Sequence, residues 1–428
     1  MTVTDNDKKV LRDLAKRFRE NAELPVMAER KKIWKDLHDL KPQRPVIMFE
    51  PYFLDGYLAD YTLQCSEGLA RSVELYMMMR LRQFEEIKDD MIFEPHFNLA
   101  WQGYNMNSTG KDFGEIQIVD EKAKDGGLAY KSTFPVKTPA DIKRMTPRTF
   151  RVEKEPVLKA QALLMDIFGD ILPVKIGNFD NFDPDLGNQV FAGNFFIGVT
   201  WDLFKLIGSE AMMLWPYDEP DGLRELLAFL VDDKKRFFNY LVQEGLVCSN
   251  TDSQFAGPSC YGYVSDLPEK KTENVGLKDL WCWSESQETE MMGPDLFEEF
   301  YLPYMAELAN MFGLSYYGCC EQVDHKLEKV FKAIHNIRII SISGWTDRNN
   351  AFEIMGNKYV GSVKPFPAYV STPSADWDAV KEEAKKTCAA AKRNNTPIEV
   401  ICRDVYGGAC TPKRAVEWVQ TWKQTLGI

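Results

Sequence analysis

The chain has 428 residues, of which 45% are hydrophobic and 12% aromatic, and this is enough for a large core. Its formal net charge of −12 at pH 7 argues against a nucleic-acid partner, although an acidic enzyme that docks another protein is compatible with it. No stretch approaches the roughly 20 apolar residues of a membrane helix, and the acidic first residues do not resemble a signal peptide. We therefore expect a cytoplasmic protein without a membrane partner. Its nine cysteines, an odd number, predict free thiols rather than a disulfide framework.

The first half of the sequence predicts an extension, a first strand and an insertion. Residues 1–43 are charged with helical spacing, which predicts an N-terminal helical extension. The apolar run 44–49 predicts a buried strand, and 68–84 predicts a long helix. Residues 103–150 contain Gly126-Gly127 and alternating segments, which predict an inserted hairpin region. With no repeat or linker, we expect one domain over residues 1–428.

The last 120 residues predict four strand–helix units in succession. The expected strands are 314–318, 337–342, 358–363 and 397–402, and the expected helices are 324–335, 347–355, 374–394 and 412–425. Strands that alternate with helices are typical of a parallel sheet with covering helices. The expected fold is therefore α/β, a (β/α)8 TIM barrel. A doubly wound open sheet is the alternative, but no glycine-rich dinucleotide motif follows an early strand.

Thiols and carboxylates gather where two of these strands end. The segment 316–322 reads Tyr-Tyr-Gly-Cys-Cys-Glu-Gln and places Cys320 and Glu321 at the turn from strand to helix. Cys402 and Asp404 follow the final strand. Because the carboxyl ends of barrel strands meet at one mouth, and zinc accepts sulfur and oxygen ligands, these four residues are the predicted zinc ligands. Two further thiols are weaker candidates: Cys410 for the distal position, and Cys319, which strand alternation favours as a core residue.

A second polar cluster lies in the segment 281–288, Trp-Cys-Trp-Ser-Glu-Ser-Gln-Glu. Glu285 and Glu288 are candidate catalytic acids. The residues that could contact a substrate are Trp281, Trp283, Gln287 and Tyr317. The structural alternative is that the two glutamates only cap or solvate the approach to the helix that starts near residue 294. His96 lies among apolar residues and is interpreted as structural, and the four cysteines Cys65, Cys248, Cys260 and Cys388 have no metal-ligand spacing.

From about residue 200 onward the chain resembles the uroporphyrinogen decarboxylase superfamily, within it the corrinoid-dependent methyltransferase branch. The resemblance rests on the segment Asp295–Tyr304, on the Tyr-Gly-Cys-Cys-Glu sequence at 317–321, and on Thr411-Pro412 before the last helix. It implies a (β/α)8 barrel, which agrees with the pattern of strands and helices.

Two departures from the family narrow the function that the resemblance implies. The thiol-methylating members hold zinc with a His-x-Cys motif whose cysteine falls on Cys320, but Gly318 stands at the histidine position, and their distal cysteine falls near Val405. The decarboxylase carries an arginine-bearing segment after its first strand, where this chain has the acidic and aromatic segment 49–53.

What the resemblance implies is an enzyme of the O-demethylase type. It would demethylate a small methoxylated compound, an aromatic one by expectation, with zinc assistance. The methyl group would pass to the corrinoid (cobalamin) of a separate corrinoid protein. The alternatives are a decarboxylase-like lyase, which needs basic residues at the barrel mouth, a methylcorrinoid:thiol methyltransferase, and a non-catalytic corrinoid-binding scaffold. Self-association into a homo-oligomer is left open.

Overall fold

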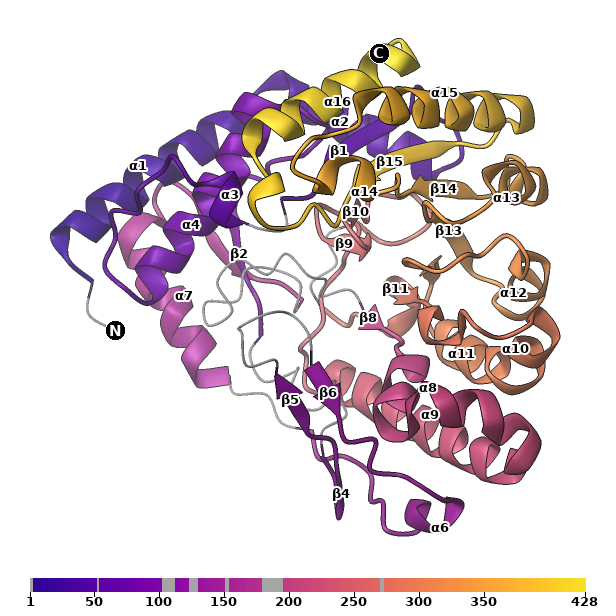
Figure 1. Cartoon of the computed structure of the whole chain (residues 1–428). Helices are drawn as coiled ribbons and strands as arrows, with labels where there is room; N and C mark the ends of the chain where they lie inside the picture. Colours follow the sequence, from indigo (N-terminus) through magenta and orange to yellow (C-terminus); the bar gives the residue numbers. More distant parts are fainter. Residues whose placement is uncertain are drawn as a thin grey trace.

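A sheet of seven parallel strands forms the centre of the molecule, in the order β1-β15-β14-β13-β12-β11-β8 (Figure 1). The structure is a computed structural model and describes residues 3–51, 54–101, 112–122, 130–150, 154–178, 195–269 and 273–428. The strands of this sheet are β1 (Val46–Phe49), β8 (Phe195–Phe196), β11 (Trp281–Ser284), β12 (Leu314–Tyr317), β13 (Ile337–Ile342), β14 (Val360–Val363) and β15 (Ile398–Cys402). The first and last strands of the chain are neighbours, which brings the two ends of the sequence together at one seam.

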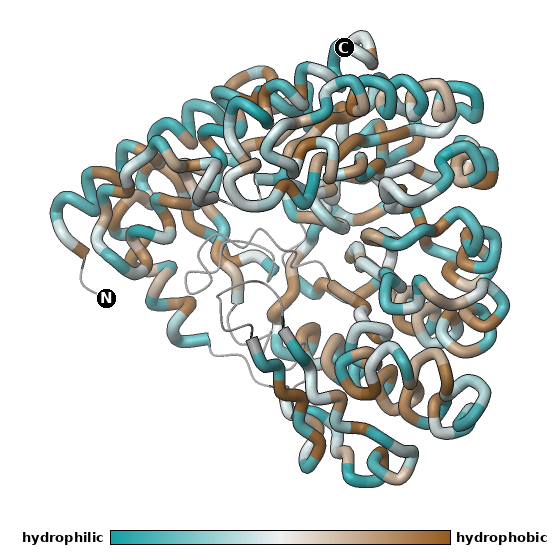
Figure 2. The backbone as a smooth tube through the Cα atoms, in the orientation of Figure 1, coloured by the Kyte–Doolittle hydropathy of each residue, from teal (hydrophilic) through white to brown (hydrophobic). Residues whose placement is uncertain are grey.

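Helices cover the outer side of this sheet and pack on one another (Figure 1). In chain order they are α1 (Asp5–Ala22), α2 (Pro25–His38), α3 (Leu54–Tyr57), α4 (Leu69–Arg82), the π-helical turn η1 (Gln83–Ile87), α6 (Pro139–Ile142), α7 (Lys154–Phe168), α8 (Val199–Asp218), α9 (Pro220–Gln243), η2 (Leu277–Asp279), η3 (Gln287–Thr289), α10 (Pro294–Phe300), α11 (Leu302–Ala309), α12 (Leu327–Ala333), α13 (Arg348–Met355), α14 (Ala368–Ser371), α15 (Trp377–Asn394), η4 (Gly407–Ala409) and α16 (Pro412–Leu426). Hydrophobic residues concentrate along the strands and on the helix faces that meet them, as Figure 2 shows. None of the described helices is long and apolar enough to cross a membrane.

Four two-stranded elements complete the structure. The strands β2 (Phe97–Leu99) and β7 (Val174–Ile176) form a parallel pair, and β9 (Phe255–Gly257) and β10 (Cys260–Tyr261) form an antiparallel hairpin. The expected hairpin insertion is present in its described part. It consists of β3 (Asp112–Phe113) with β4 (Ile116–Gln117), and β5 (Asp120–Lys122) with β6 (Tyr130–Ser132). The remainder of the expected insertion, residues 103–111 and 123–129, lies outside the described residues.

Side chains replace ladder hydrogen bonds where the seven-stranded sheet ends. On the free edge of β1, the N–H groups of Ile47 and Phe49 donate to the carboxylates of Asp90 (2.8 Å) and Asp89 (2.9 Å). At the amino end of β11, Trp281 exchanges two hydrogen bonds with the side-chain amide of Asn250, at 2.9 and 3.1 Å. These side-chain hydrogen bonds satisfy buried backbone groups that have no neighbouring strand to pair with. The α/β class and the parallel sheet are therefore confirmed, and closure into an eight-stranded barrel stays a prediction.

Candidate functional site

A pair of carboxyl groups, Glu285 buried and Glu288 half-buried, lies where β11 ends. Glu285 follows the last residue of β11 and is 2% exposed. Its Oε2 accepts a hydrogen bond from the Gln287 N–H (2.7 Å), whereas its Oε1 is buried and has no hydrogen-bond partner in the described part of the chain. Glu288, in η3, accepts a hydrogen bond from the hydroxyl of Thr200 (2.9 Å), which lies in the first turn of α8. The pair thus lies between the carboxyl end of β11 and the start of α8, at the edge where parallel α/β folds place their chemistry.

This environment favours the protonated form of the pair. Burial raises the pKa of Glu285 well above its usual value, and the charges of Glu288 and Glu321 raise it further. Burial also raises the pKa of Glu288. Loss of solvation and like charge both disfavour the ionised form of a carboxyl group. Glu285 thus combines a raised pKa with a buried oxygen, Oε1, that has no hydrogen-bond partner in the described part of the chain.

The buried amine of Lys326 lies beside this acid. Its Nζ donates a hydrogen bond to the Ser286 hydroxyl at 2.9 Å. Burial lowers the pKa of Lys326, and the nearby glutamates oppose that effect. The cluster therefore combines carboxyl groups with a single compensating cation from the loop that precedes α12.

Glu321 connects the loops that follow β11 and β12. One carboxylate oxygen accepts hydrogen bonds from the N–H (2.8 Å) and the hydroxyl (3.2 Å) of Ser286. The other oxygen accepts a hydrogen bond from the Cys319 N–H at 2.8 Å. Both oxygens are thus held by protein donors, so Glu321 braces the two loops rather than presenting a free ligand atom.

Cys319 and Cys320 lie next to each other at the end of β12, with their Sγ atoms 3.6 Å apart. Cys320 is the exposed member of the pair, and the hydrogen bond from the Cys319 thiol lowers its pKa. The same contact raises the pKa of Cys319. A thiol with a lowered pKa and solvent access is the reactive kind of cysteine.

We expect limiting iodoacetamide at pH 7.5 to alkylate Cys320 before the other eight cysteines. The physical reason is that Cys320 is the exposed one of the nine and has a lowered pKa. Peptide mass spectrometry after partial labelling measures the order. Earlier labelling of Cys388, which is half-buried on an outer helix, would contradict this expectation.

The four predicted zinc ligands lie near the carboxyl ends of β12 and β15, and the charges of Asp404 and Glu321 act on the Cys320 thiol. Cys402 is buried on the face of β15 opposite Arg403, where burial and the neighbouring Cys410 raise its pKa well above the usual value. Asp404 follows in a left-handed conformation (φ 58°) and accepts a hydrogen bond from the Tyr406 hydroxyl at 3.3 Å. No three of Cys320, Glu321, Cys402 and Asp404 have ligand atoms within 4.8 Å of one another. The physical reasons are the alternation of side chains along β15 and the engagement of Glu321 by backbone donors.

The predicted substrate contacts divide between the two ends of the sheet. Trp283 is half-buried near the acid pair, and its ring lies 4.5 Å from that of Phe196. Trp281 is fully buried at the opposite, amino end of β11, away from the acid pair. Tyr317 is also fully buried, with its hydroxyl 2.8 Å from Ser286 Oγ. Gln287 is half-buried and its N–H orients Glu285, so Gln287 and Trp283 stay candidates for substrate contact.

A second cluster, which the sequence did not reveal, lies at the amino end of the sheet. His38, Cys260 and Glu399 are fully buried, and one ligand atom from each lies within 4.8 Å of the others. This cluster could hold a metal ion. Its members are separated by 222 and 139 residues, so no local spacing indicates them.

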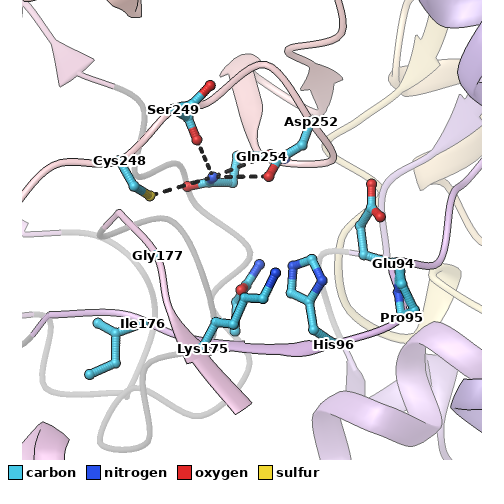
Figure 3. Close-up of a pocket in the computed structure, with 11 residues that line it drawn as sticks. Glu94, Pro95, His96, Lys175, Ile176, Gly177, Cys248, Ser249, Asp252 and Gln254 are labelled. Carbon is cyan, nitrogen blue, oxygen red and sulfur yellow. Dashed lines mark hydrogen bonds between the residues drawn. The ribbon is translucent and has the colours of Figure 1, made fainter. Parts of the chain in front are cut away.

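A cavity of about 220 Å³ lies between the β2–β7 pair and the segment 248–254 (Figure 3). Figure 3 shows His96 and Lys175 on one wall, with Asp252 and Gln254 on the other. His96, interpreted from sequence as structural, is one of the residues that line this cavity. Burial raises the pKa of Asp252 to about 6, which places its titration close to neutral pH.

We expect Asp252→Asn to stabilise the protein at pH 8 by up to about 3 kcal/mol, and by less at pH 4.5. The folded pKa of about 6 exceeds the usual 3.8, so the folded state binds more protons than the unfolded state between these values. Wild-type stability therefore falls as pH rises from about 4 to 6, whereas the amide does not titrate. Urea unfolding at both pH values measures the difference, with the exposed Asp166→Asn as the control. An equal effect at both pH values would contradict this assignment.

The family resemblance rests on short segments of the second half of the chain, and two of them bear on the site. The Tyr-Gly-Cys-Cys-Glu segment forms the end of β12 and the loop that Glu321 braces, and Asp295–Tyr304 spans α10 and the start of α11. A comparison of the whole sequence with models of protein families and with curated proteins gives no match.

Proposed function

We propose that the protein is an enzyme that removes a methyl group from a small methoxylated aromatic compound and passes it to the corrinoid of a partner protein. The observation that carries the proposal is the Glu285–Glu288 pair at the carboxyl end of β11, where burial and like charge raise the pKa of Glu285 and its buried Oε1 has no hydrogen-bond partner in the described part of the chain. The resemblance to the corrinoid-dependent methyltransferase branch supports the same reaction class.

The chemistry requires an acid at the ether oxygen. The bond between the methyl carbon and the oxygen breaks, and both bonding electrons stay with the oxygen, which is a poor leaving group unless it is protonated. The corrinoid, when the partner protein presents it, supplies the nucleophile that accepts the methyl group. Glu285 donates the proton, so that the organic product leaves as an alcohol or phenol. A positioned general acid contributes about 10² to 10⁴ to the rate of such a step.

Neighbouring residues would bind the substrate and hold the acid. The half-buried Trp283, beside Phe196, offers an aromatic face for the substrate ring. The Gln287 N–H fixes the orientation of the Glu285 carboxyl, and the Thr200 hydroxyl does the same for Glu288. Lys326, a buried amine on which the charges of the glutamates act, would stabilise the carboxylate that Glu285 becomes after proton transfer.

Zinc assistance is not part of this mechanism. No three of the residues predicted to bind zinc have ligand atoms within 4.8 Å of one another. Both carboxylate oxygens of Glu321 already accept hydrogen bonds from backbone N–H groups. The three side chains that could hold a metal ion are His38, Cys260 and Glu399. They lie at the amino end of the sheet, where a bound ion cannot contact the ether oxygen beside Glu285. We therefore derive no step through zinc.

The lyase alternative requires cations that converge on the mouth for a polycarboxylated tetrapyrrole. Arg403 is a cation at that end, and it is paired with the Glu50 carboxylate. The buried amine of Lys326 is held against Ser286 and the glutamates. This charge balance favours a neutral or weakly anionic substrate over a polyanion.

The proposal is tested by incubating the anaerobically purified protein with chemically reduced free cobalamin and a panel of methoxybenzoates and methoxyphenols. We expect the absorbance of the reduced cobalamin to decay with at least one compound, together with an equimolar amount of its demethylated product. Decarboxylation of a tetrapyrrole substrate, without turnover of any methoxylated compound, would favour the lyase and overturn the proposal.

A further inference from the structure

Three side chains with the chemistry of metal ligands converge at the amino end of the sheet. His38 is the last residue of α2, Cys260 is the first residue of β10, and Glu399 is the second residue of β15. Each is fully buried, with an exposed fraction of 0%. The three elements are far apart in the sequence, and they meet only here.

The distances between the three donor atoms fit a shared ion. His38 Nε2 lies 3.3 Å from Glu399 Oε2 and 3.7 Å from Cys260 Sγ, and Cys260 Sγ lies 3.4 Å from Glu399 Oε2. Tetrahedral zinc with its usual bond lengths of about 2.0–2.3 Å separates such ligand atoms by about 3.3–3.6 Å. The triangle of nitrogen, sulfur and oxygen is therefore close to the one that a tetrahedral ion requires.

The groups behind the three donors hold them in the orientation for binding. His38 Nδ1 lies 2.9 Å from the backbone carbonyl oxygen of Tyr263, which places the ring proton on Nδ1 and leaves the Nε2 lone pair facing Cys260 and Glu399. The other oxygen of Glu399 accepts a hydrogen bond from the Ser362 hydroxyl. A carbonyl behind the histidine and a hydroxyl behind the carboxylate are the usual outer partners of metal ligands.

An unpaired hydroxyl faces the same cluster. Tyr316 is fully buried, and its hydroxyl has no hydrogen-bond partner in the described part of the chain. The charges of Cys260 and Glu399 act on this hydroxyl, which places it near them.

The charges of the cluster are compatible with an ion. The Cys260 thiol donates a hydrogen bond to Glu399, and the buried amine of Lys364 reaches the same carboxylate through the Ser362 hydroxyl. On metal binding the thiol would lose its proton, and the thiolate and carboxylate would then supply two negative charges to a divalent cation. Without an ion, the Nε2 lone pair would face a carboxylate oxygen in a site that excludes water, unless the imidazole were protonated. Burial of charged groups is costly unless they are paired or bind a metal.

We propose that His38, Cys260 and Glu399 bind zinc as a structural centre that fastens α2 and the β9–β10 hairpin to the sheet. The mixed nitrogen, sulfur and oxygen set suits a borderline-soft divalent cation. The amino end of a parallel α/β sheet is the edge that serves stability rather than catalysis. This centre is independent of the proposed methyl transfer, because it lies at the opposite end of the strands.

Elemental analysis of the full-length protein, purified without chelator, tests this centre. We expect about one zinc per chain in the wild type and less than a tenth of that in Cys260→Ser and in Glu399→Gln. Cys388→Ser is the matched control, since this cysteine lies on the outer helix α15, and it is expected to keep its zinc. A chelator is expected to lower the Tm of the wild type and of Cys388→Ser, but not that of Cys260→Ser.

Two results would overturn the proposal. One is a wild type that contains no zinc and, after chelation and dialysis, binds none on titration. The other is zinc retained in both Cys260→Ser and Glu399→Gln but lost in Cys320→Ser, which would place the ion at the carboxyl end of the strands. If the two cluster variants do not fold, the test uses wild-type protein from which the zinc has been removed with a chelator and replaced by Co²⁺. A thiolate charge-transfer band that survives iodoacetamide labelling of Cys320 supports the buried site, and its absence contradicts it.

Discussion

Glu285→Gln is expected to lower kcat/KM for demethylation by about 10² to 10⁴, with little change in the Tm. The glutamine keeps the shape of the side chain and the acceptor for the Gln287 N–H, but it cannot donate a proton to the ether oxygen. The measurement is the initial rate of product formation with the best methoxylated compound and reduced cobalamin. The matched control is Glu290→Gln, since Glu290 is exposed in the same loop and is expected to keep its activity within about twofold.

The pH dependence of the activity distinguishes a carboxyl group that donates a proton from one that has only a structural role. Activity requires the protonated form of Glu285, so it is expected to fall as pH rises through the raised pKa of the pair. Glu288→Gln removes a negative charge that raises this pKa, so the alkaline limb of the profile is expected to move to lower pH. An unchanged profile in Glu288→Gln, or full activity in Glu285→Gln, would show that the pair does not supply the proton.

Glu50→Ala is expected to lower the free energy of unfolding by about 3–5 kcal/mol. Glu50 follows β1 and pairs with Arg403, which follows β15, and the two side chains are 2% and 7% exposed. The variant leaves a buried guanidinium without its main counter-charge at the seam between the first and last strands. Urea unfolding measures the change, and the exposed Glu155→Ala, which breaks a surface pair with Lys159, is the control with an expected effect below about 1 kcal/mol.

The double variant Glu50→Ala/Arg403→Met tests the cause of that loss. If the cost comes from an unpaired buried charge, removal of the charge as well is expected to restore much of the stability. A single variant within about 1 kcal/mol of the wild type would contradict the role of this ion pair. So would a double variant that is less stable than both single variants.

The sequence predicted the second half of the fold closely. The expected strand 337–342 and the observed β13 (Ile337–Ile342) coincide, and β14 and β15 each lie within one or two residues of the expected bounds. These strands are short apolar runs between amphipathic helices, so local pattern alone identifies them. The sequence did not predict β2, which has three residues, or the side-chain hydrogen bonds of Asp89, Asp90 and Asn250 that satisfy the edges of β1 and β11. Such long-range side-chain bonds leave no local pattern.

The candidate site was predicted in part. Glu285 and Glu288 were found because acidic residues directly after an aromatic strand are unusual, and their burial is what gives them chemistry. Cys402 was predicted as a ligand because it ends a strand, and only the fold shows that it is buried beside Cys410. Glu321 was predicted as a ligand from its position after a strand, and only the fold shows that both its carboxylate oxygens accept hydrogen bonds from the backbone of Ser286 and Cys319.

The buried cluster was not predictable from local pattern. His38 reads as a basic residue in the last turn of a charged helix, and Glu399 reads as one polar residue within a strand. Cys260 has no partner at a metal-binding spacing. Only the packing of α2 and the β9–β10 hairpin against the sheet brings the three donors together.

The central claim is that the methyl group moves intact from an ether oxygen while Glu285 supplies the proton. The most direct measurement uses a methoxylated aromatic compound with a deuterated methyl group, reduced cobalamin and the purified enzyme. With the wild type, we expect mass spectrometry to show the trideuterated methyl group on the cobalamin, in an amount equal to that of the phenol product. With Glu285→Gln, we expect only a background level of labelled cobalamin. Two results would contradict the claim. One is that the cobalamin stays unlabelled and the methyl ether stays intact for every compound of the panel. The other is that the wild type and Glu285→Gln transfer equal amounts of the methyl group.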